Sequence, residues 1–199
     1  MRTGAELHDE INKKIVGRLA LITHDESDLL YKFAGLDSDY LEIGCLWGGT
    51  AILAARAKIN NGVHGHVYSI DKMEGGYWDN GDPVADHKIP TLKKVQENLK
   101  RFKVDKRVTI MVQNSHPLDL PEGLMPRVVL IDGAHSYEGC KTDWLNVRKL
   151  APDYVMFHDY ASPRHPGVQK VVDEIIESDS EWVEVARADT LIVLGKVKA

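Results

Sequence analysis

The sequence predicts an α/β fold with a doubly wound, mainly parallel sheet that is covered by helices on both faces. Short apolar runs alternate with longer segments of helical periodicity, which is the pattern of parallel strands joined by helices. Several runs stop at a polar residue, as at Asp71 and Asp132. Ligands bind beyond the carboxyl ends of the strands in such folds, so we expect these polar residues at one shared edge of the sheet.

Two predicted helices precede this pattern. Leu7, Ile11 and Ile15 recur at four-residue spacing, and a second helical segment around Leu30 ends before Gly35. We expect them to form a helical preface, residues 1–38, to a core of residues 39–199. No linker, repeat or low-complexity segment divides the chain, so residues 1–199 are expected to form a single domain.

The core reads as seven strands with helices between them. The first strand begins at Tyr40 and is halted by Gly44, and the others are predicted at 67–70, 108–112, 128–131, 154–157, 182–187 and 191–197. Predicted helices include an alanine-rich one that ends at 60–62, one at 90–102, one around 137–147 and one around 168–175. Three prolines between 112 and 128 leave room for a short crossover helix at most. The last two strands read as a hairpin that adds antiparallel strands at one edge.

The composition argues against several classes of protein. A formal net charge of -5 does not favour a nucleic-acid partner, because phosphates are bound by clustered Lys and Arg. Cys45 and Cys140 are the only cysteines and lack metal-ligand spacing, which fits a reducing, cytoplasmic location. No apolar run approaches the roughly 18 residues of a membrane span. We therefore expect neither nucleic acid nor membrane as a partner.

A glycine motif, Glu42-x-Gly44-x-x-x-Gly48-Gly49-Thr50, follows the first strand. Glycines there let the backbone approach a ligand, and the next helix offers unpaired N–H groups at its amino terminus. The motif departs from the GxGxxG pattern of dinucleotide sites, which leaves room for a nucleoside or an amino-acid moiety. A plain tight turn between strand and helix is the alternative interpretation.

Polar residues at the ends of the next two strands are further candidates for ligand binding. Asp71 lies a little over twenty residues beyond the glycines, where an acidic side chain can accept hydrogen bonds from ribose hydroxyls. Taken alone it could equally cap its own turn, but the preceding glycine turn favours the ligand-binding role. Asn114 and Ser115 follow the third strand, where an amide could recognise the edge of an aromatic base, although turn residues have the same composition.

Acids and histidines gather at the ends of two further strands. Asp132 ends one, and His158 and Asp159 end the next. Neighbouring carboxylates repel one another unless a cation or proton joins them, so a divalent metal is the economical explanation. The alternative makes Asp132 a helix cap and His158 a hydrogen-bonded strand-end residue. His135 shares a turn with Asp132 and suits a general base, although a lone loop histidine is more often a surface residue.

Two loops at the same edge combine glycine or proline with larger side chains. They are residues 75–83, with two aromatics, and residues 162–167. Loops of this kind can close over a substrate, and ordinary surface connections have the same composition.

The stretches EIGCLWGGT, VYSID, IDGAHSYEGCKTDW and FHDY followed by PGV resemble the class I S-adenosylmethionine-dependent methyltransferases. The resemblance runs from about Tyr40 to the end and is closest to the metal-dependent O-methyltransferases that include macrocin O-methyltransferase, a methyltransferase family 24-like group. It implies a Rossmann-like three-layer sandwich whose seven-stranded sheet has one antiparallel strand, here with two extra N-terminal helices. It also implies O-methylation of a hydroxyl on a small molecule such as a sugar, a polyketide or a catechol-like compound.

Roles for individual residues follow from the same resemblance. Asp132 and Asp159 would hold a magnesium or manganese ion, and His135 would be the catalytic base. His158 stands where such relatives usually carry another oxygen ligand, and imidazole suits manganese, iron or zinc better than magnesium. The residues expected to take part in cofactor binding are Glu42, Gly44, Gly48 and Thr50 at the methionine end, Asp71 at the ribose, Asn114 and Ser115 at the adenine, and Asp132, which also belongs to the catalytic group.

Two other functions stay open from the sequence. One is a nicotinamide-dependent oxidoreductase on a similar sheet, against which the missing GxGxxG counts. The other is a nucleoside-binding module without catalysis, in which the crowded acids and histidines would have no purpose. The sequence also leaves open a homo-oligomer, for which the two leading helices offer a partner surface or a lid over the cofactor.

Overall fold

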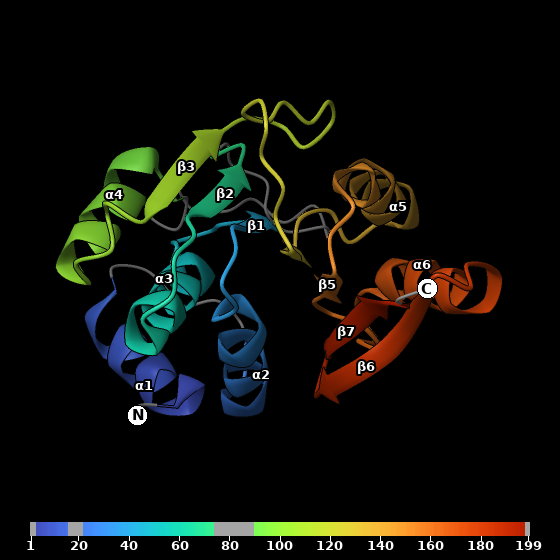
Figure 1. Ribbon diagram of the computed structural model, residues 1–199, viewed down its shortest axis with the longest axis horizontal. Coiled ribbons are helices and arrows are strands. Elements are labelled where there is room, and N and C mark those ends of the chain that lie inside the picture. Colours follow the sequence, from blue (N-terminus) through green and yellow to red (C-terminus); the bar gives the residue numbers. More distant parts are fainter. Residues whose placement is uncertain (1–2, 16–21, 74–89, 198–199) are drawn as a thin grey trace.

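A computed structural model describes residues 3–15, 22–73 and 90–197 of the chain. Over these residues, none of the helices is long and apolar enough to span a membrane. The strands form one sheet in the order β3-β2-β1-β4-β5-β7-β6 (Figure 1). They are β1 Tyr40–Ile43, β2 Val67–Asp71, β3 Val108–Val112, β4 Val128–Ile131, β5 Tyr154–Phe157, β6 Trp182–Ala188 and β7 Leu191–Lys196. Strand β7 runs antiparallel to both its neighbours and the other pairs are parallel, which confirms the predicted sheet.

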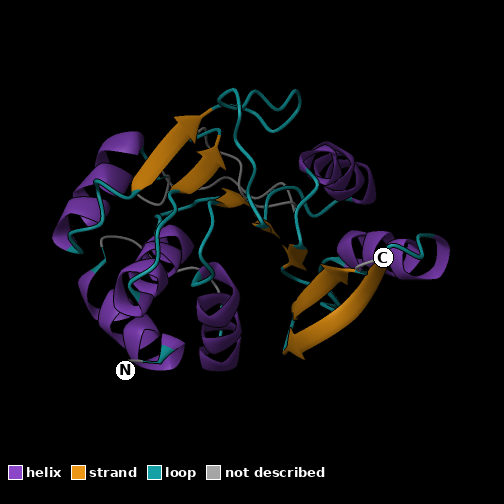
Figure 2. Ribbon diagram, viewed as in Figure 1, coloured by secondary structure: helices purple, strands orange, loops and turns teal. Residues whose placement is uncertain are grey.

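Helices cover both faces of the sheet and complete three layers (Figure 2). The helices are α1 Gly4–Lys14, α2 His24–Ala34, α3 Gly49–Asn61, α4 Leu92–Arg101, α5 Tyr137–Val147 and α6 Pro166–Ser178, with a 3-10 turn at Arg148–Leu150. Because strand side chains alternate, Tyr40 packs in one cluster with residues of α1 to α4, whereas Leu41 and Ile43 pack in a second cluster with α5 and α6. The doubly wound, three-layer prediction is confirmed.

The two N-terminal helices are part of this core. Each begins with a capping box, Thr3 with Glu6 in α1 and Thr23 with Glu26 in α2, which satisfies the first backbone N–H groups of the helix. Their apolar stripes are buried: Leu30 is 1% exposed and belongs to the same cluster as Tyr40 of β1.

Most predicted boundaries agree with the structure to within two residues. The helix predicted at 90–102 begins at Leu92, because the side chain of Thr91 caps it by accepting the Lys94 backbone N–H. The described residues 113–127 contain no helix, in line with the prolines there. Leu118 and Leu120 of this connection pack against the α5–α6 cluster instead.

Strand register aligns the residues that follow β1, β4 and β5. Ile131 pairs with Ile43 on one side and with Phe157 on the other. The pairing continues one step further, since the Asp132 N–H donates to Ile43 at 2.8 Å and the His158 N–H donates to Ile131 at 3.1 Å. Ile131 and Phe157 face α5 and α6, so the alternation turns the next residues, Asp132 and His158, toward the side of α1 to α4.

Candidate functional site

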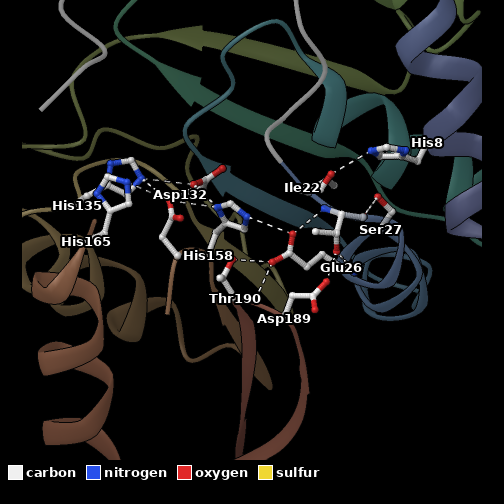
Figure 3. Close-up of polar contacts among 12 residues, drawn as sticks. His8, Ile22, Glu26, Ser27, Asp132, His135, His158, His165, Asp189 and Thr190 are labelled. Carbon is white, nitrogen blue, oxygen red and sulfur yellow. Dashed lines mark hydrogen bonds and ion pairs between the residues drawn. The ribbon is translucent and has the colours of Figure 1, made fainter. Parts of the chain in front are cut away.

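Five side chains meet at the carboxyl ends of β4 and β5 and form what we call the acid–imidazole cluster (Figure 3). Asp132 Oδ1 lies 3.1 Å from His158 Nδ1 and 3.7 Å from His135 Nε2. Asp159 Oδ2 lies 3.1 Å from His135 Nε2, 3.4 Å from His158 Nδ1 and 3.9 Å from His165 Nε2. The structure therefore brings together all four residues that the sequence analysis assigned to the metal and the base, and adds His165.

Local backbone geometry positions Asp159. Its φ of 63° lies in the left-handed region, which Asp tolerates better than most residues. The chain reverses its direction there directly after β5, and the carboxylate lies against the rings of His135 and His158. A strained conformation of this kind persists only where surrounding contacts hold it.

The remaining histidines come from two loops that touch. His135 follows β4, and His165 is the residue that precedes the first turn of α6. Their ring centroids are 4.2 Å apart. Gly167 makes the approach possible, because a Cβ atom there would lie 2.4 Å from the Tyr137 backbone nitrogen and 2.7 Å from the His135 carbonyl oxygen.

The acids and imidazoles shift one another's pKa. Burial lowers the pKa of His158, but the charge of Asp132 and hydrogen bonds to the acids outweigh burial and raise it well above its ordinary value. Burial also opposes protonation of His135, yet its contacts with Asp132 and Asp159 raise its pKa to about 10. Burial raises the pKa of Asp132 and of Asp159. The neighbouring histidines lower it by more, so the pKa of each acid lies below its usual range. Without a cation, the two carboxylates therefore favour the protonated form of both rings.

The donor set fits a divalent transition metal. Asp132, His158 and Asp159 each offer a ligand atom, and these atoms lie within 4.8 Å of one another. A second set, His135, Asp159 and His165, meets the same criterion and shares Asp159. Carboxylates mixed with imidazole favour manganese, iron, cobalt or zinc over magnesium, which prefers oxygen ligands alone.

The glycine motif adjoins this cluster. Gly44 has a φ of +98°, and a Cβ atom there would lie 2.0 Å from the Asp132 carbonyl oxygen, so only glycine fits where β1 ends beside β4. Asp71 holds the turn that follows: its Oδ2 accepts the backbone N–H groups of Cys45 and Leu46, each at 2.9 Å. Asp71 is 6% exposed, and its Oδ1 also accepts the Met73 backbone N–H at 2.8 Å, which is the capping of its own turn that the sequence left open beside ribose binding.

Glu42 and Thr50 of the same motif lie beneath the turn. Both are buried, and Glu42 Oε1 accepts the Ser69 hydroxyl at 2.6 Å. Burial raises the pKa of Glu42 to about 8, although hydrogen bonds from Ser69 and Thr50 oppose the rise. Within the described residues, Glu42 Oε2 has no hydrogen-bond partner.

Asn114 and Ser115 stand apart from the acid–imidazole cluster. They follow β3, one residue beyond Gln113, whose N–H donates to the Asp71 carbonyl at 3.2 Å. The Asn114 side chain accepts the His116 N–H at 3.2 Å, and the Ser115 carbonyl accepts from Asn146 of α5 at 3.3 Å. Both contacts are those of turn residues.

The sequence analysis did not single out Glu26 or Thr190, and it assigned His165 only to a loop. Glu26 approaches His158 from α2, and Thr190 of the β6–β7 turn bonds to Glu26. The Thr-x-x-Glu pattern at Thr23 and Glu26, which the sequence analysis did not use, is a signal for a helix start and carries no information on the burial of the acid. His165 lay in a loop expected to close over a substrate, while the other such loop, residues 75–83, lies outside the described residues.

The strand order, the single reversed strand and the glycine turn beside acid-bearing strand ends define the fold of the class I methyltransferases. A family model described as "Methyltransferase domain" matches residues 41–160, which is more than half of the chain. The chain therefore belongs to this methyltransferase family, which removes the nicotinamide-dependent oxidoreductase alternative. No curated protein sequence matches the chain.

Solved structures similar to this chain are methyltransferases. The O-methyltransferase NovP is 17% identical with a TM-score of 0.72, and the match covers 98% of this chain and 88% of that chain. Cofactor-bound Rv0187 from MTB is 18% identical with a TM-score of 0.67, covering 98% and 87%. CalS11, a TDP-rhamnose 3'-O-methyltransferase in calicheamicin biosynthesis, is 14% identical with a TM-score of 0.58, covering 88% and 81%. At these identities the likeness shows the fold.

Proposed function

We propose that this chain is an S-adenosylmethionine-dependent O-methyltransferase that methylates a hydroxyl of a small molecule with the help of a divalent metal ion. The observation that carries the proposal is the convergence of Asp132, His158 and Asp159 next to the glycine turn at Gly44. Acids that converge in this way fit a cation that also orients an acceptor oxygen. The adjoining turn, where Gly44 and Gly48 bring bare backbone to the carboxyl end of β1, fits the cofactor.

The cofactor residues divide into two groups by their surroundings. Gly44 and Gly48 form the turn itself and let the methionine end of S-adenosylmethionine approach the backbone. Glu42, Thr50 and Asp71 support that turn from beneath or from the side. Their contact with the cofactor, the ribose contact of Asp71 and the adenine contacts of Asn114 and Ser115 are parts of the proposal.

The proposed reaction needs one proton acceptor and one positively charged methyl donor. Asp132 and Asp159 would hold the metal ion, which would lower the pKa of an acceptor hydroxyl. With both acids engaged as ligands, the negative charge that raises the pKa of His135 is compensated, and its Nε2 can accept the hydroxyl proton. The oxygen forms a bond to the methyl carbon, the carbon–sulfur bond breaks, and its electron pair returns to sulfur.

The small-molecule acceptor is proposed on two grounds. The chain carries no excess of positive charge to bind a polynucleotide, its formal net charge being -5. CalS11, which shares the fold, is named as a TDP-rhamnose methyltransferase, so a sugar hydroxyl belongs in the first panel of acceptors. One fold serves many acceptors, so the panel should also include polyketide and catechol-like hydroxyls.

The test is release of S-adenosylhomocysteine when the protein is offered S-adenosylmethionine, Mn²⁺ and a panel of hydroxylated acceptors. We expect His135→Ala to lose at least about 100-fold in turnover, the range of general base catalysis, with cofactor affinity nearly unchanged. His64→Ala, which alters an exposed histidine on another edge, should behave as wild type. Turnover of His135→Ala within a few-fold of wild type would remove the base assignment.

The metal is tested separately with Asp159→Asn and with a chelator. Asparagine tolerates the left-handed backbone of Asp159, so the substitution removes charge without adding the strain that alanine would bring. We expect both treatments to abolish turnover, and Mn²⁺ to restore only the chelated wild type. An unchanged rate after chelation would contradict the metal-assisted reaction.

Three coarser expectations accompany this proposal. They are a single domain spanning residues 1–199, a cytoplasmic location, and a homo-oligomer as one way to use the surface of the N-terminal helices. Each stays a prediction.

A further inference from the structure

A carboxylate reaches the acid–imidazole cluster from the N-terminal helices. Glu26, in the first turn of α2, is 1% exposed, and its side chain lies between His158 and Thr190 (Figure 3). Its Oε2 atom is 3.6 Å from His158 Nε2. Helix α2 precedes residues 41–160, so the family match does not account for this contact.

Helix capping explains only part of this arrangement. Helix α1 begins with the same Thr-x-x-Glu box, in which the exposed Glu6 accepts the Thr3 backbone N–H at 3.1 Å. Glu26 does the same for Thr23 at 2.7 Å. Its Oε1 also accepts the backbone N–H and the hydroxyl of Thr190, at 2.8 and 2.6 Å. Glu6 shows that capping needs no burial, so the burial of Glu26 has another cause.

Besides Thr190, the buried Glu26 side chain faces the far edge of the His158 ring. Nδ1 of His158 faces Asp132 and Asp159, while Nε2 on the opposite edge is fully buried. Among the described residues Nε2 has no partner at ordinary hydrogen-bond length, and Glu26 Oε2 lies just beyond that length. A buried N–H group requires an acceptor. A carboxylate behind a histidine fixes which nitrogen carries the hydrogen and where the other nitrogen points.

We propose that Glu26 is a positioning residue. It accepts the Nε2 hydrogen of His158 and holds the ring with Nδ1 turned toward Asp132 and Asp159, so that α2 completes the candidate metal site. The link to a metal rests on the proposed function, whereas the link between Glu26 and the His158 ring does not. Helix α2 is itself fixed to the β6–β7 turn, through Thr190 and through the Thr23 hydroxyl, which donates to Asp189 at 2.5 Å.

The test compares Glu26→Gln with wild type in two measurements. Glutamine keeps the size of the side chain and an oxygen for Thr190, but it removes the charge that faces His158. Nuclear magnetic resonance of ¹⁵N-histidine-labelled protein reports the buried Nε2 proton of His158, which we expect to shift or to exchange away in the variant. Calorimetric titration with Mn²⁺ should show binding about 10–100-fold weaker, the usual effect of losing such a partner. Affinity for S-adenosylmethionine should stay within about twofold.

Two control variants separate positioning from helix docking. Glu6→Gln changes the matched capping box of α1, and Thr190→Val removes one hydrogen bond to Glu26 without touching His158. Both should keep Mn²⁺ affinity and the His158 resonance close to wild type, with any loss confined to the melting temperature. If Thr190→Val weakens Mn²⁺ binding as much as Glu26→Gln, helix docking is responsible and the proposal is wrong.

The two hypotheses fail in different ways. A wild type that binds Mn²⁺ and transfers methyl groups, with a His158 resonance unmoved by Glu26→Gln, would overturn the positioning role and leave the function standing. A wild type that binds no Mn²⁺, with a His158 resonance that Glu26→Gln does move, would overturn the metal-assisted function and the metal link, and would uphold the contact between Glu26 and the ring.

Discussion

Glu42 is a carboxylic acid enclosed between β1, β2 and α3. It is fully buried, it accepts a hydrogen bond from the Ser69 hydroxyl, and burial raises its pKa to about 8. The folded chain therefore keeps this side chain protonated at neutral pH, whereas the unfolded chain ionises it from about pH 4.5 upward. Folding at neutral pH takes up a proton at Glu42, which couples stability to pH.

Glu42→Gln should flatten the pH dependence of stability. In wild type the contribution of Glu42 is largest below about pH 4.5 and is lost as the pH rises to about 8, because only the unfolded state gains by ionising over that interval. Glutamine cannot ionise, so we expect the variant to be more stable than wild type at pH 8 by a margin on the order of a few kcal/mol. Urea denaturation at several pH values measures this.

The control is Glu97→Gln, which changes an exposed acid on α4. Its stability should run parallel to wild type at every pH. Parallel curves for Glu42→Gln as well would show that Glu42 titrates normally in the folded chain.

At the residue scale, the position of a site residue was predictable where strand geometry alone determines it. Asp132 and His158 end neighbouring parallel strands, and such ends lie at one edge of the sheet, so their meeting followed from the sequence pattern. Glu26 was not predictable, because its position depends on how α2 docks against the β6–β7 turn, and local sequence signals do not encode such docking. The protonated state of Glu42 likewise depends on burial by three elements.

At the element scale, the amino terminus of α6 and the loop after β4 form a tight contact at Gly167. A Cβ atom there would overlap backbone atoms of Tyr137 and His135, which cannot move aside as a side chain can. The contact keeps the rings of His135 and His165 at their separation of 4.2 Å. The sequence analysis placed Pro166 and Gly167 in the loop 162–167, whereas α6 begins at Pro166, and it offered no structural reason for the glycine.

Gly167→Ala should therefore destabilise the fold and loosen the site together. We expect a loss of about 1–3 kcal/mol in the free energy of unfolding, as for other overpacked positions, and weaker Mn²⁺ binding because His135 and His165 are pushed apart. Helix propensity alone would give the opposite sign, since alanine favours helix over glycine. Thermal melts and metal titration measure the two effects.

Gln169→Ala is the control, two residues along the same helix and exposed. It should leave both stability and metal affinity close to wild type. If Gly167→Ala were as stable as wild type, the loop after β4 would make room for the added Cβ atom at little cost in the free energy of unfolding.

The strand elements were the most predictable, because polar or glycine residues mark where each apolar run stops. All seven strands of the described sheet begin and end where the pattern placed them or within one residue, and β3, β4 and β5 agree at both ends. Helix starts were less predictable. The helix predicted to begin at Pro90 begins at Leu92, because the Thr91 side chain caps it and Pro90 lies outside the helix. Capping by a side chain is a local contact that apolar periodicity does not register.

At the scale of the whole molecule, the two N-terminal helices and the sheet share one hydrophobic core. Leu30 packs in the same cluster as Val128 of β4 and Leu191 of β7, residues far apart in the chain. The sequence periodicity predicted both helices, and the interpretation was that they form a preface, residues 1–38, to a core of residues 39–199. Docking of α1 and α2 against the sheet buries the apolar stripe of each helix. An isolated pair of helices would leave these stripes exposed to water.

Leu30→Ala should destabilise the entire molecule by about 2–5 kcal/mol, the usual cost of such a cavity in a core. All four tryptophans lie beyond residue 38, so tryptophan fluorescence reports only the sheet-bearing part, while circular dichroism also reports α1 and α2. If the chain is one domain, urea unfolding curves from both probes shift by the same amount and coincide. Leu145→Ala, at a position 43% exposed, should shift neither by more than about 0.5 kcal/mol. A variant whose circular dichroism falls early while its fluorescence transition stays at the wild-type urea concentration would mean that residues 1–38 unfold independently.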